Sequence, residues 1–301
     1  MTGKKKKVLI LGSGGFVGRN LKEYLERFDE YELLCPRHSE LDLLEESQVE
    51  AYLRQHLPDV IINAAVCKNP KYFQSASPMT ELEQDIRMFY NLERCHDLYG
   101  KMLYFGSGAE FDKRKDVRSV KENEFTNGIP ANDYGLAKYV IGRAIESSEN
   151  IYNLRLFGLF GKYENWRTTF ISGACCKALK NLPITIRQNV VFDYLYIDDF
   201  CPIVRWFVDH QPKYHSYNIA SGRKIDLVTI AETVKKLSGN NVPIYVCKDG
   251  LGKEYTADNT RLKNEFADFY ATDFEKSASD LLEYYRSIDR QIDLYSLLYI
   301  L

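Results

Sequence analysis

The stretch "KVLILGSGGFVGRNLKEYLERF" (residues 7–28) decides the fold. Its first part, "KVLILG" (7–12), is an apolar run with the length of a buried strand, and "FVGRNLKEYLERF" (16–28) repeats its apolar residues at helical spacing. A glycine-rich turn joins the two parts. Because a strand that passes through a tight turn into a helix is the first half of a βαβ unit, this stretch predicts a parallel sheet covered by helices.

The same alternation continues over the next 130 residues. The expected strands cover residues 31–35, 59–65, 101–108 and 152–158, and the expected helices cover 45–57, 80–100 and 132–148. Strands that alternate with helices in this way are typical of an open sheet with helices on both faces. We therefore predict an α/β protein with a Rossmann-type, doubly wound parallel sheet.

Composition excludes several classes of protein. The chain has 301 residues, of which 45% are hydrophobic and 27% charged, and its net charge is −2. This balance gives no global field that would attract nucleic acid, and no window approaches the roughly 18 apolar residues of a membrane span. The seven cysteines and five histidines are scattered without metal-ligand spacing. We expect a cytoplasmic protein without a metal site.

The glycine turn is the first candidate functional motif. It fits the pattern G-x-x-G-x-x-G with Gly12, Gly15 and Gly18, and the next helix begins at Phe16 and Val17. Glycine permits a tight turn and a close approach of the backbone to a diphosphate, and a helix N-terminus supplies amide donors. An ordinary loop would also hold glycines, but the strand before and the helix after favour dinucleotide binding, in which Phe16 and Val17 would also contact the cofactor.

The end of the second strand indicates which dinucleotide is bound. NAD sites usually place a carboxylate there for the ribose 2′-hydroxyl, whereas arginine suits a 2′-phosphate. Here Arg37 and His38 follow the strand, and Glu32 lies too early. This favours NADP, with NAD still possible because Arg37 is equally consistent with a residue that only faces solvent.

The regular alternation of expected strands and helices ends after residue 161. A helix is expected at 166–182, strands at 192–200 and 214–221, a helix at 226–239, a strand at 243–247 and a helical tail from about residue 273. We predict a smaller C-terminal α/β lobe that binds the substrate, formed by 161–190 and 221–301. The dinucleotide-binding domain would comprise 1–160, and elements near 190–220 would rejoin it.

Three further motifs follow the glycine turn: "NAA" (63–65), "FGSGAEF" (105–111) and "YGLAK" (134–138). In this order they give a chain that resembles the extended short-chain dehydrogenase/reductases, the NAD-dependent epimerase/dehydratase family. Within that family the chain is most similar to the nucleotide-sugar branch, notably the GDP-L-fucose synthases and the dTDP-4-dehydrorhamnose reductases. The resemblance spans the whole chain and is specific to about residue 200.

The resemblance implies roles for individual residues. Tyr134 and Lys138 match the catalytic pair, and Ser107 matches the catalytic hydroxyl. The residues that match the cofactor-contacting positions are Asp42 and Leu43 on the adenine side and Asn63, Ala64 and Ala65 along the cofactor. A free tyrosine has a pKa near 10, and we expect the Lys138 ammonium to lower the pKa of Tyr134 toward the operating pH. Lys138 would also hydrogen-bond the nicotinamide ribose.

Departures from the family pattern reduce the number of reactions that the protein is expected to catalyse. Gly108 and Ala109 stand where dehydratases have an acidic pair, and Glu110 is out of place for that role. Fucose synthases use a cysteine at the position of Ala109 and a histidine downstream, but residues 161–173 contain no histidine. Dehydration and epimerisation at C3 and C5 are therefore disfavoured, and reduction remains.

The substrate-binding residues are less well marked. Ser107, Gly108 and Ala109 would line the substrate site, and Gly158 replaces an asparagine that contacts the substrate diphosphate in the family. The residues that would replace this contact are Asn165, Arg167 and Arg187. Arginine suits a diphosphate because its planar fork gives two parallel hydrogen bonds. For each of the three, an ordinary surface position is an equally good interpretation.

The motifs together predict an NADPH-dependent reductase of a nucleotide-activated 4-keto-6-deoxy sugar, serving surface polysaccharide synthesis. One alternative is a nucleotide-sugar 4-epimerase that keeps NAD tightly bound, and a second is a non-catalytic dinucleotide-sensing regulator. The resemblance also implies a homodimer that is formed through helices near 82–99 and 134–149.

Overall fold

A sheet of six parallel strands forms the centre of the protein. The computed structural model describes residues 4–67 and 79–298. The strand order is β2-β1-β3-β4-β6-β11. These strands are β1 (Lys6–Leu11), β2 (Tyr31–Leu34), β3 (Val60–Asn63), β4 (Lys101–Ser107), β6 (Ile151–Leu156) and β11 (Ser216–Ile219). Because the chain leaves β1 for β2 on one side and returns to β3 on the other, the order reverses between β1 and β3. Ligands of open α/β sheets bind at such a point.

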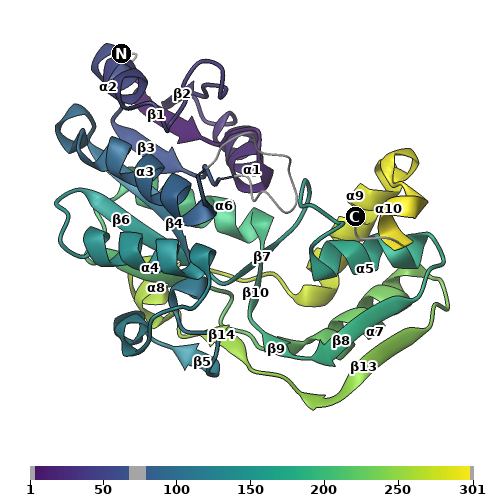
Figure 1. The fold of residues 1–301 in the computed structure, drawn as a ribbon. Helices are drawn as coiled ribbons and strands as arrows, with labels where there is room; N and C mark the ends of the chain where they lie inside the picture. The colour runs from purple at the N-terminus through teal and green to yellow at the C-terminus, as the bar shows by residue number, and fades with distance from the viewer. Residues whose placement is uncertain (1–3, 68–78, 299–301) are drawn as a thin grey trace.

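Helices cover both faces of this sheet (Figure 1). On one face lie α1 (Phe16–Leu25) and α6 (Ile197–Asp209), and on the other lie α2 (Glu46–His56), α3 (Glu81–Glu93) and α4 (Asp133–Ile145). Alternate residues of β1 serve the two faces: Val8 and Ile10 pack with α1 and α6, whereas Leu9 and Leu11 pack with the other three helices. This is the predicted doubly wound arrangement.

Smaller sheets extend from the carboxyl ends of the central strands. One pairs β7 (Gly158–Phe160) with β10 (Tyr194–Tyr196), and another has the order β12-β9-β14-β5. The strands of the latter are β5 (Val117–Val120), β9 (Val191–Phe192), β12 (Ile225–Asp226) and β14 (Tyr255–Ala257). The β14 strand pairs with both β5 and β9, so it brings a late segment of the chain beside the turn that follows β4.

A lobe built mainly from the last third of the chain lies beside the sheet (Figure 1). Its elements are α5 (Phe170–Leu179), β8 (Ile184–Asn189), α7 (Leu227–Ser238), β13 (Ile244–Leu251), α9 (Phe274–Ser287) and α10 (Leu294–Leu298). The α5, α7 and α9 helices pack on one another, and β13 pairs with β8. The remaining helical segments are η1 (His96–Leu98), η2 (Gly108–Glu110), η3 (Glu122–Asn127), α8 (Thr260–Glu265) and η4 (Asp289–Gln291).

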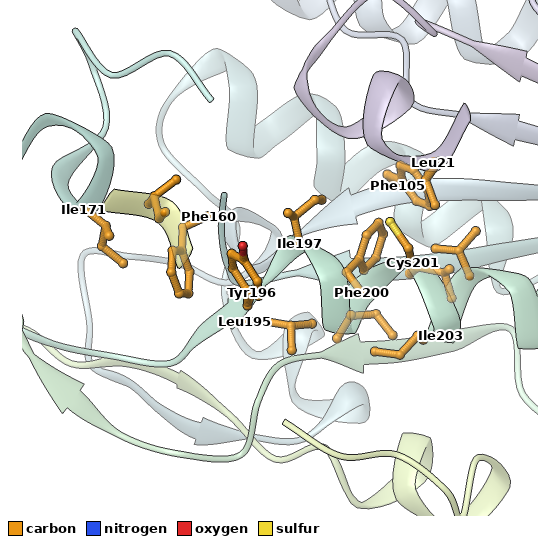
Figure 2. Packing of buried hydrophobic residues seen from close by; sticks show 14 of the residues in the cluster. Leu21, Phe105, Phe160, Ile171, Leu195, Tyr196, Ile197, Phe200, Cys201 and Ile203 are labelled. Carbon is orange, nitrogen blue, oxygen red and sulfur yellow. The ribbon is translucent and has the colours of Figure 1, made fainter. Parts of the chain in front are cut away.

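One hydrophobic core joins the lobe to the sheet. Figure 2 shows the α6 residues Ile197, Phe200 and Ile203 in this core, with Ile171 of α5 at its lobe end. The Phe200 ring meets the Phe105 ring of β4 edge to face, with ring centroids 5.3 Å apart. The lobe is therefore packed against the carboxyl ends of the strands, where the candidate site lies.

The observed elements confirm the predicted fold class. The bounds of two expected strands are wrong. The strand expected at 192–200 ends at Tyr196, and α6 begins at the next residue. The aromatic residues of this segment favour a strand, and Pro202 disfavours a helix, yet Pro202 lies inside α6. The strand expected at 243–247 continues to Leu251. In the part of the chain that the structure describes, no helix has the length and apolar character needed to cross a membrane.

Candidate active site

The glycine turn lies against the end of β3. Gly12 has a φ of +75°, and a Cβ added there would lie 2.7 Å from the carbonyl oxygen of Ala64. A Cβ on Gly18 would lie 2.3 Å from the carbonyl oxygen of Gly12. Both positions therefore require glycine, the first for its conformation and the second for the contact between helix and turn. The Ala64 amide donates to Leu11 (3.1 Å), and Asn63 Oδ1 accepts from the Ala65 amide (3.2 Å).

The residues of this turn fit the diphosphate of a dinucleotide. Among the described residues, no side chain caps the N-terminus of α1, whose N-cap is Gly15 and whose first turn carries no acid. A Cβ on Gly14 would meet no atom within 4 Å, so the turn is open on that side. Phe16 and Val17 pack their side chains against the core and leave their amides at the helix start. Free amides and the helix dipole favour an anion there.

The segment after β2 starts beside the glycine turn, because the Cys35 thiol lies within hydrogen-bonding reach of Ser13. Arg37 is exposed, and its amide donates to the Glu40 carboxylate (2.7 Å). The His38 side chain is 82% exposed.

Asp42 and Leu43 stand a few residues farther along. The Asp42 carboxylate accepts from the Leu44 amide (2.9 Å). Leu43 is buried in the core, and its carbonyl accepts from Asn91 of α3 (2.9 Å). The Leu43 side chain therefore packs in the core. Only the backbone of Leu43 is left for its predicted contact on the adenine side of the cofactor.

Ser107, Tyr134 and Lys138 converge at the end of β4. Ser107 is the last residue of β4 and is 8% exposed, and its Oγ accepts from the Ala109 amide (3.1 Å). Tyr134 lies in the first turn of α4, where Asn132 caps the helix, and its phenol is within hydrogen-bonding reach of Ser107. Lys138 follows one turn later, and its ammonium lies 5.8 Å from the centroid of the Tyr134 ring. The structure thus brings the three predicted residues together.

The expected effect of Lys138 on Tyr134 is wrong. Burial raises the pKa of Tyr134 to about 12, Ser107 acts in the opposite direction, and the Asp85 and Glu110 carboxylates add to the rise. Lys138 is itself buried, which lowers its pKa. Its ammonium donates to the Tyr104 hydroxyl (2.8 Å) and to the carbonyl of Phe105 (3.0 Å). Because the ammonium is directed at β4 and not at the Tyr134 oxygen, burial determines the pKa of the phenol.

Two glycines let α4 rest on the turn that follows Ser107. A Cβ on Gly135 would lie 2.8 Å from the Ala109 carbonyl oxygen, and a Cβ on Gly142 would lie 2.5 Å from Glu110 Oε2. Glycine weakens a helix by about 1 kcal/mol relative to alanine. The helix that carries Tyr134 and Lys138 therefore contains these glycines for close packing.

Glu110 belongs to a buried ion pair, away from any catalytic role. Glu110 and Arg155 are both fully buried and form a hydrogen-bonded salt bridge. The Asn153 amide donates to both oxygens of the carboxylate (3.0 and 3.1 Å). The Ser107 amide donates to Glu110 Oε1 (3.1 Å). The carboxylate therefore supports the backbone of Ser107 from inside.

Tyr255 is a site residue that sequence reasoning did not identify. It begins β14 and is 8% exposed, and its phenol is within hydrogen-bonding reach of Ser107. A Cβ on Gly108 would lie 2.3 Å from the Tyr255 oxygen and 2.8 Å from Phe157 Cδ1. The small residue at 108 thus makes room for a second phenol. No local motif marks position 255, since 148 residues separate it from Ser107.

The predicted diphosphate ligands lie elsewhere in the lobe. Asn165 and Arg167 are exposed before α5, and the Arg167 guanidinium lies 5.1 Å from the centroid of the Trp166 ring. Arg167 and Lys177 border a cavity of about 260 Å³ between α5 and α10. Arg187 is exposed on β8. Within the described residues, no hydrogen bond or ion pair joins these side chains to Ser107, so their binding role stays a prediction.

Within residues 4–67 and 79–298, no three His, Cys, Asp or Glu side chains are grouped as a metal site requires.

Comparisons with known proteins agree with this geometry. The model of the NAD dependent epimerase/dehydratase family matches residues 8–220. GDP-L-colitose synthase of Yersinia pseudotuberculosis is 23% identical over 301 aligned positions, which cover 93% of this chain and 97% of that protein.

Two solved structures share the fold. A GDP-L-fucose synthetase from Naegleria fowleri has a TM-score of 0.80 at 16% identity, with 95% of both chains covered. A GDP-mannoheptose C4 reductase from Campylobacter jejuni with NADP bound has a TM-score of 0.78 at 16% identity, covering 95% of this chain and all of that one. Since the family model spans most of the chain, the protein belongs to the NAD dependent epimerase/dehydratase family, whose enzymes depend on NAD(P).

Proposed function

We propose that the protein is an NADPH-dependent reductase of a nucleotide-activated 4-keto-6-deoxy sugar, serving surface polysaccharide synthesis. The observation that carries this proposal is the half-buried Tyr134 phenol beside Ser107, with Lys138 one turn away. Similar proteins named as GDP-sugar synthases and a GDP-sugar C4 reductase support the substrate class. Gly108 and Ala109, which offer neither an acid nor a thiol, support reduction without dehydration or epimerisation.

The protonation state of Tyr134 suits a reductase. When bound at the glycine turn, NADPH supplies the hydride. Tyr134 donates its proton to the substrate oxygen as that oxygen becomes an alkoxide, and Ser107 orients the oxygen by a hydrogen bond. A phenol with a pKa of about 12 keeps its proton at neutral pH, yet it is a far stronger acid than an alcohol, so the transfer is downhill.

A 4-epimerase with tightly bound NAD is the second candidate. It must first remove a proton from the substrate hydroxyl, and burial, which raises the pKa of Tyr134, opposes the ionised phenol that this step needs. The raised pKa therefore favours the reductase. A dinucleotide sensor would have no need of a proton donor beside Ser107.

The division into domains stays a proposal. Residues 1–160, with elements near 190–220, would bind the dinucleotide, and 161–190 and 221–301 would bind the nucleotide sugar. NADP is the proposed cofactor because Arg37 follows β2 at the position where an arginine contacts a 2′-phosphate. A homodimer through α3 and α4, which pack side by side on one face, is proposed as well (Figure 1).

The test is NADPH oxidation by the purified protein with GDP-, dTDP-, UDP- and CDP-activated 4-keto-6-deoxy sugars. We expect turnover with at least one of them and a loss of about 10²- to 10⁴-fold in kcat for Tyr134→Phe, with NADPH binding retained. A protein that binds NADPH and reduces none of these sugars would refute the proposal. Stoichiometric NAD⁺ in the purified protein would favour the epimerase.

A further inference from the structure

Tyr255 reaches the catalytic hydroxyl from a distant part of the chain. The β14 strand pairs with β5 at Val117 and with β9 at Phe192, and these pairings place Tyr255 beside the turn after β4. The Tyr255 ring packs on Phe157 (centroids 5.2 Å apart) and on Phe192 (5.8 Å). The Lys113 ammonium lies 4.4 Å from the ring centroid. These contacts therefore hold the ring and fix the direction of the phenol oxygen.

The backbone of Gly108 lies so close to the Tyr255 oxygen that residue 108 has no room for a side chain. Any side chain larger than hydrogen at Gly108 would begin 2.3 Å from the Tyr255 oxygen and 2.8 Å from Cζ, so one of the two residues would have to move. The phenol thus fills the space next to Ser107. Two phenols, those of Tyr134 and Tyr255, are then within hydrogen-bonding reach of one serine oxygen.

The hydrogen-bonding capacity of serine limits how these groups are arranged. A hydroxyl donates one hydrogen bond and accepts two. The Ala109 amide already occupies one acceptor site of Ser107 Oγ. Burial raises the pKa of Tyr255 well above its ordinary value, so its phenol keeps a proton to donate. If Tyr255 fills the second acceptor site, Ser107 can interact with a further oxygen only as a donor.

We propose that Tyr255 is a positioning residue that acts through Ser107, by donating to its oxygen and so directing the serine proton to the carbonyl oxygen of the substrate. This inference rests on the proposed reduction. Without the Tyr255 hydroxyl, Ser107 accepts the hydrogen bond of Tyr134 and draws the transferable proton away from the substrate. Ser107 keeps its own proton throughout, and the O–H bond of Tyr134 breaks as that of the product alcohol forms.

Tyr255→Phe tests the proposal, because it keeps the ring and removes only the hydroxyl. With a sugar that the wild-type protein reduces, we expect kcat to fall about 10-fold and KM to change less than about 2-fold. In the Ser107→Ala background the same substitution should lower kcat no further. Tyr194→Phe is the matched control, since Tyr194 packs on the same Phe192 ring (centroids 5.2 Å apart), and its kcat should stay at the wild-type value.

Thermal unfolding of the same variants gives a readout that needs no activity. If the two hydroxyls are bonded, the Tm losses of Ser107→Ala and Tyr255→Phe will sum to more than the loss of the double variant. An unchanged kcat for Tyr255→Phe, or a full 10-fold loss in the Ser107→Ala background, overturns the proposal. A wild-type protein that reduces no sugar refutes the proposed function, and additive Tm losses then overturn the Tyr255–Ser107 coupling as well.

Discussion

Replacing Arg155 by methionine will destabilise the protein strongly, because it removes the cation from a buried ion pair. Arg155 lies on β6, and its buried guanidinium contacts the Glu110 carboxylate and the Phe125 ring (4.1 Å to the centroid). It also donates to the Glu122 carbonyl (3.2 Å). Methionine has a similar length and no charge. The Glu110 carboxylate would keep its two neutral donors, Asn153 and the Ser107 amide, and would lose its counter-charge.

The size of the effect follows from the burial of both partners. Removal of one partner of a buried pair costs about 3–5 kcal/mol, since the remaining charge is uncompensated. Unfolding entropy of about 2.1 cal/mol/K per residue gives a chain of this length about 0.6 kcal/mol/K, so a loss of about 4 kcal/mol lowers Tm by about 6 °C. Circular dichroism during heating measures this shift.

Two comparisons make the measurement decisive. Arg155→Met combined with Glu110→Gln removes both charges of this pair, so the double variant should regain much of the lost stability. Arg54→Met is the surface control: its side chain is 62% exposed and lies 2.8 Å from the partly exposed Glu50, so we expect only a small loss of Tm. The reasoning is refuted if Arg155→Met shifts Tm no more than Arg54→Met does.

Four further predictions concern the site and its surroundings. Gly142→Ala should lower the free energy of unfolding by about 1–3 kcal/mol, measured as a lower Tm, because the new Cβ would lie 2.5 Å from Glu110. A stabilised variant, as the helix propensity of alanine alone would give, would contradict the close packing of α4. Arg37→Ala should weaken NADPH binding about 10-fold or more and leave NADH binding unchanged, as measured by fluorescence titration, and equal losses for both would exclude a 2′-phosphate contact. The rate of reduction should show no titration of Tyr134 between about pH 6 and about pH 9, because its pKa of about 12 keeps the phenol protonated; a pH step in this range that disappears in Tyr134→Phe would contradict this. Burial raises the pKa of Glu164 to about 7, so its stabilising effect is complete at acid pH and is lost as the pH rises through 7; Glu164→Gln should therefore raise Tm above about pH 7 and not at about pH 4, and an equal shift at both would refute the raised pKa.

Features that depend on neighbours in the sequence were predictable. The apolar run of β1, the glycines of the turn and the amphipathic α1 are local patterns, and each element was found within a few residues of its expected bounds. Tyr134 and Lys138 were expected on one helical face, because residues four apart in a helix are neighbours. Ser107 was expected at the end of β4, since the apolar run before it ends there.

Features that depend on distant parts of the chain were not predictable. Tyr255 reaches Ser107 only because β14 inserts between β5 and β9, and the short strand carries no motif of its own. Arg155 and Glu110 are 45 residues apart, and nothing in either segment shows that they form a buried pair. The pKa of Tyr134 was misjudged for the same reason, because its burial depends on tertiary packing and its spacing from Lys138 does not show the direction of the ammonium.

The glycines around the site explain how a phenol and a serine on different elements keep a fixed relation. Gly135 and Gly142 cost α4 about 2 kcal/mol of helix propensity together, and in return the helix contacts the turn that starts at Ser107. The same turn is held from inside by Glu110, whose carboxylate accepts from the Ser107 amide. Tyr134 therefore approaches Ser107 through two rigid supports, a packed helix and a buried ion pair. Because neither support touches the substrate, both act by keeping the proton donor in place before the substrate binds.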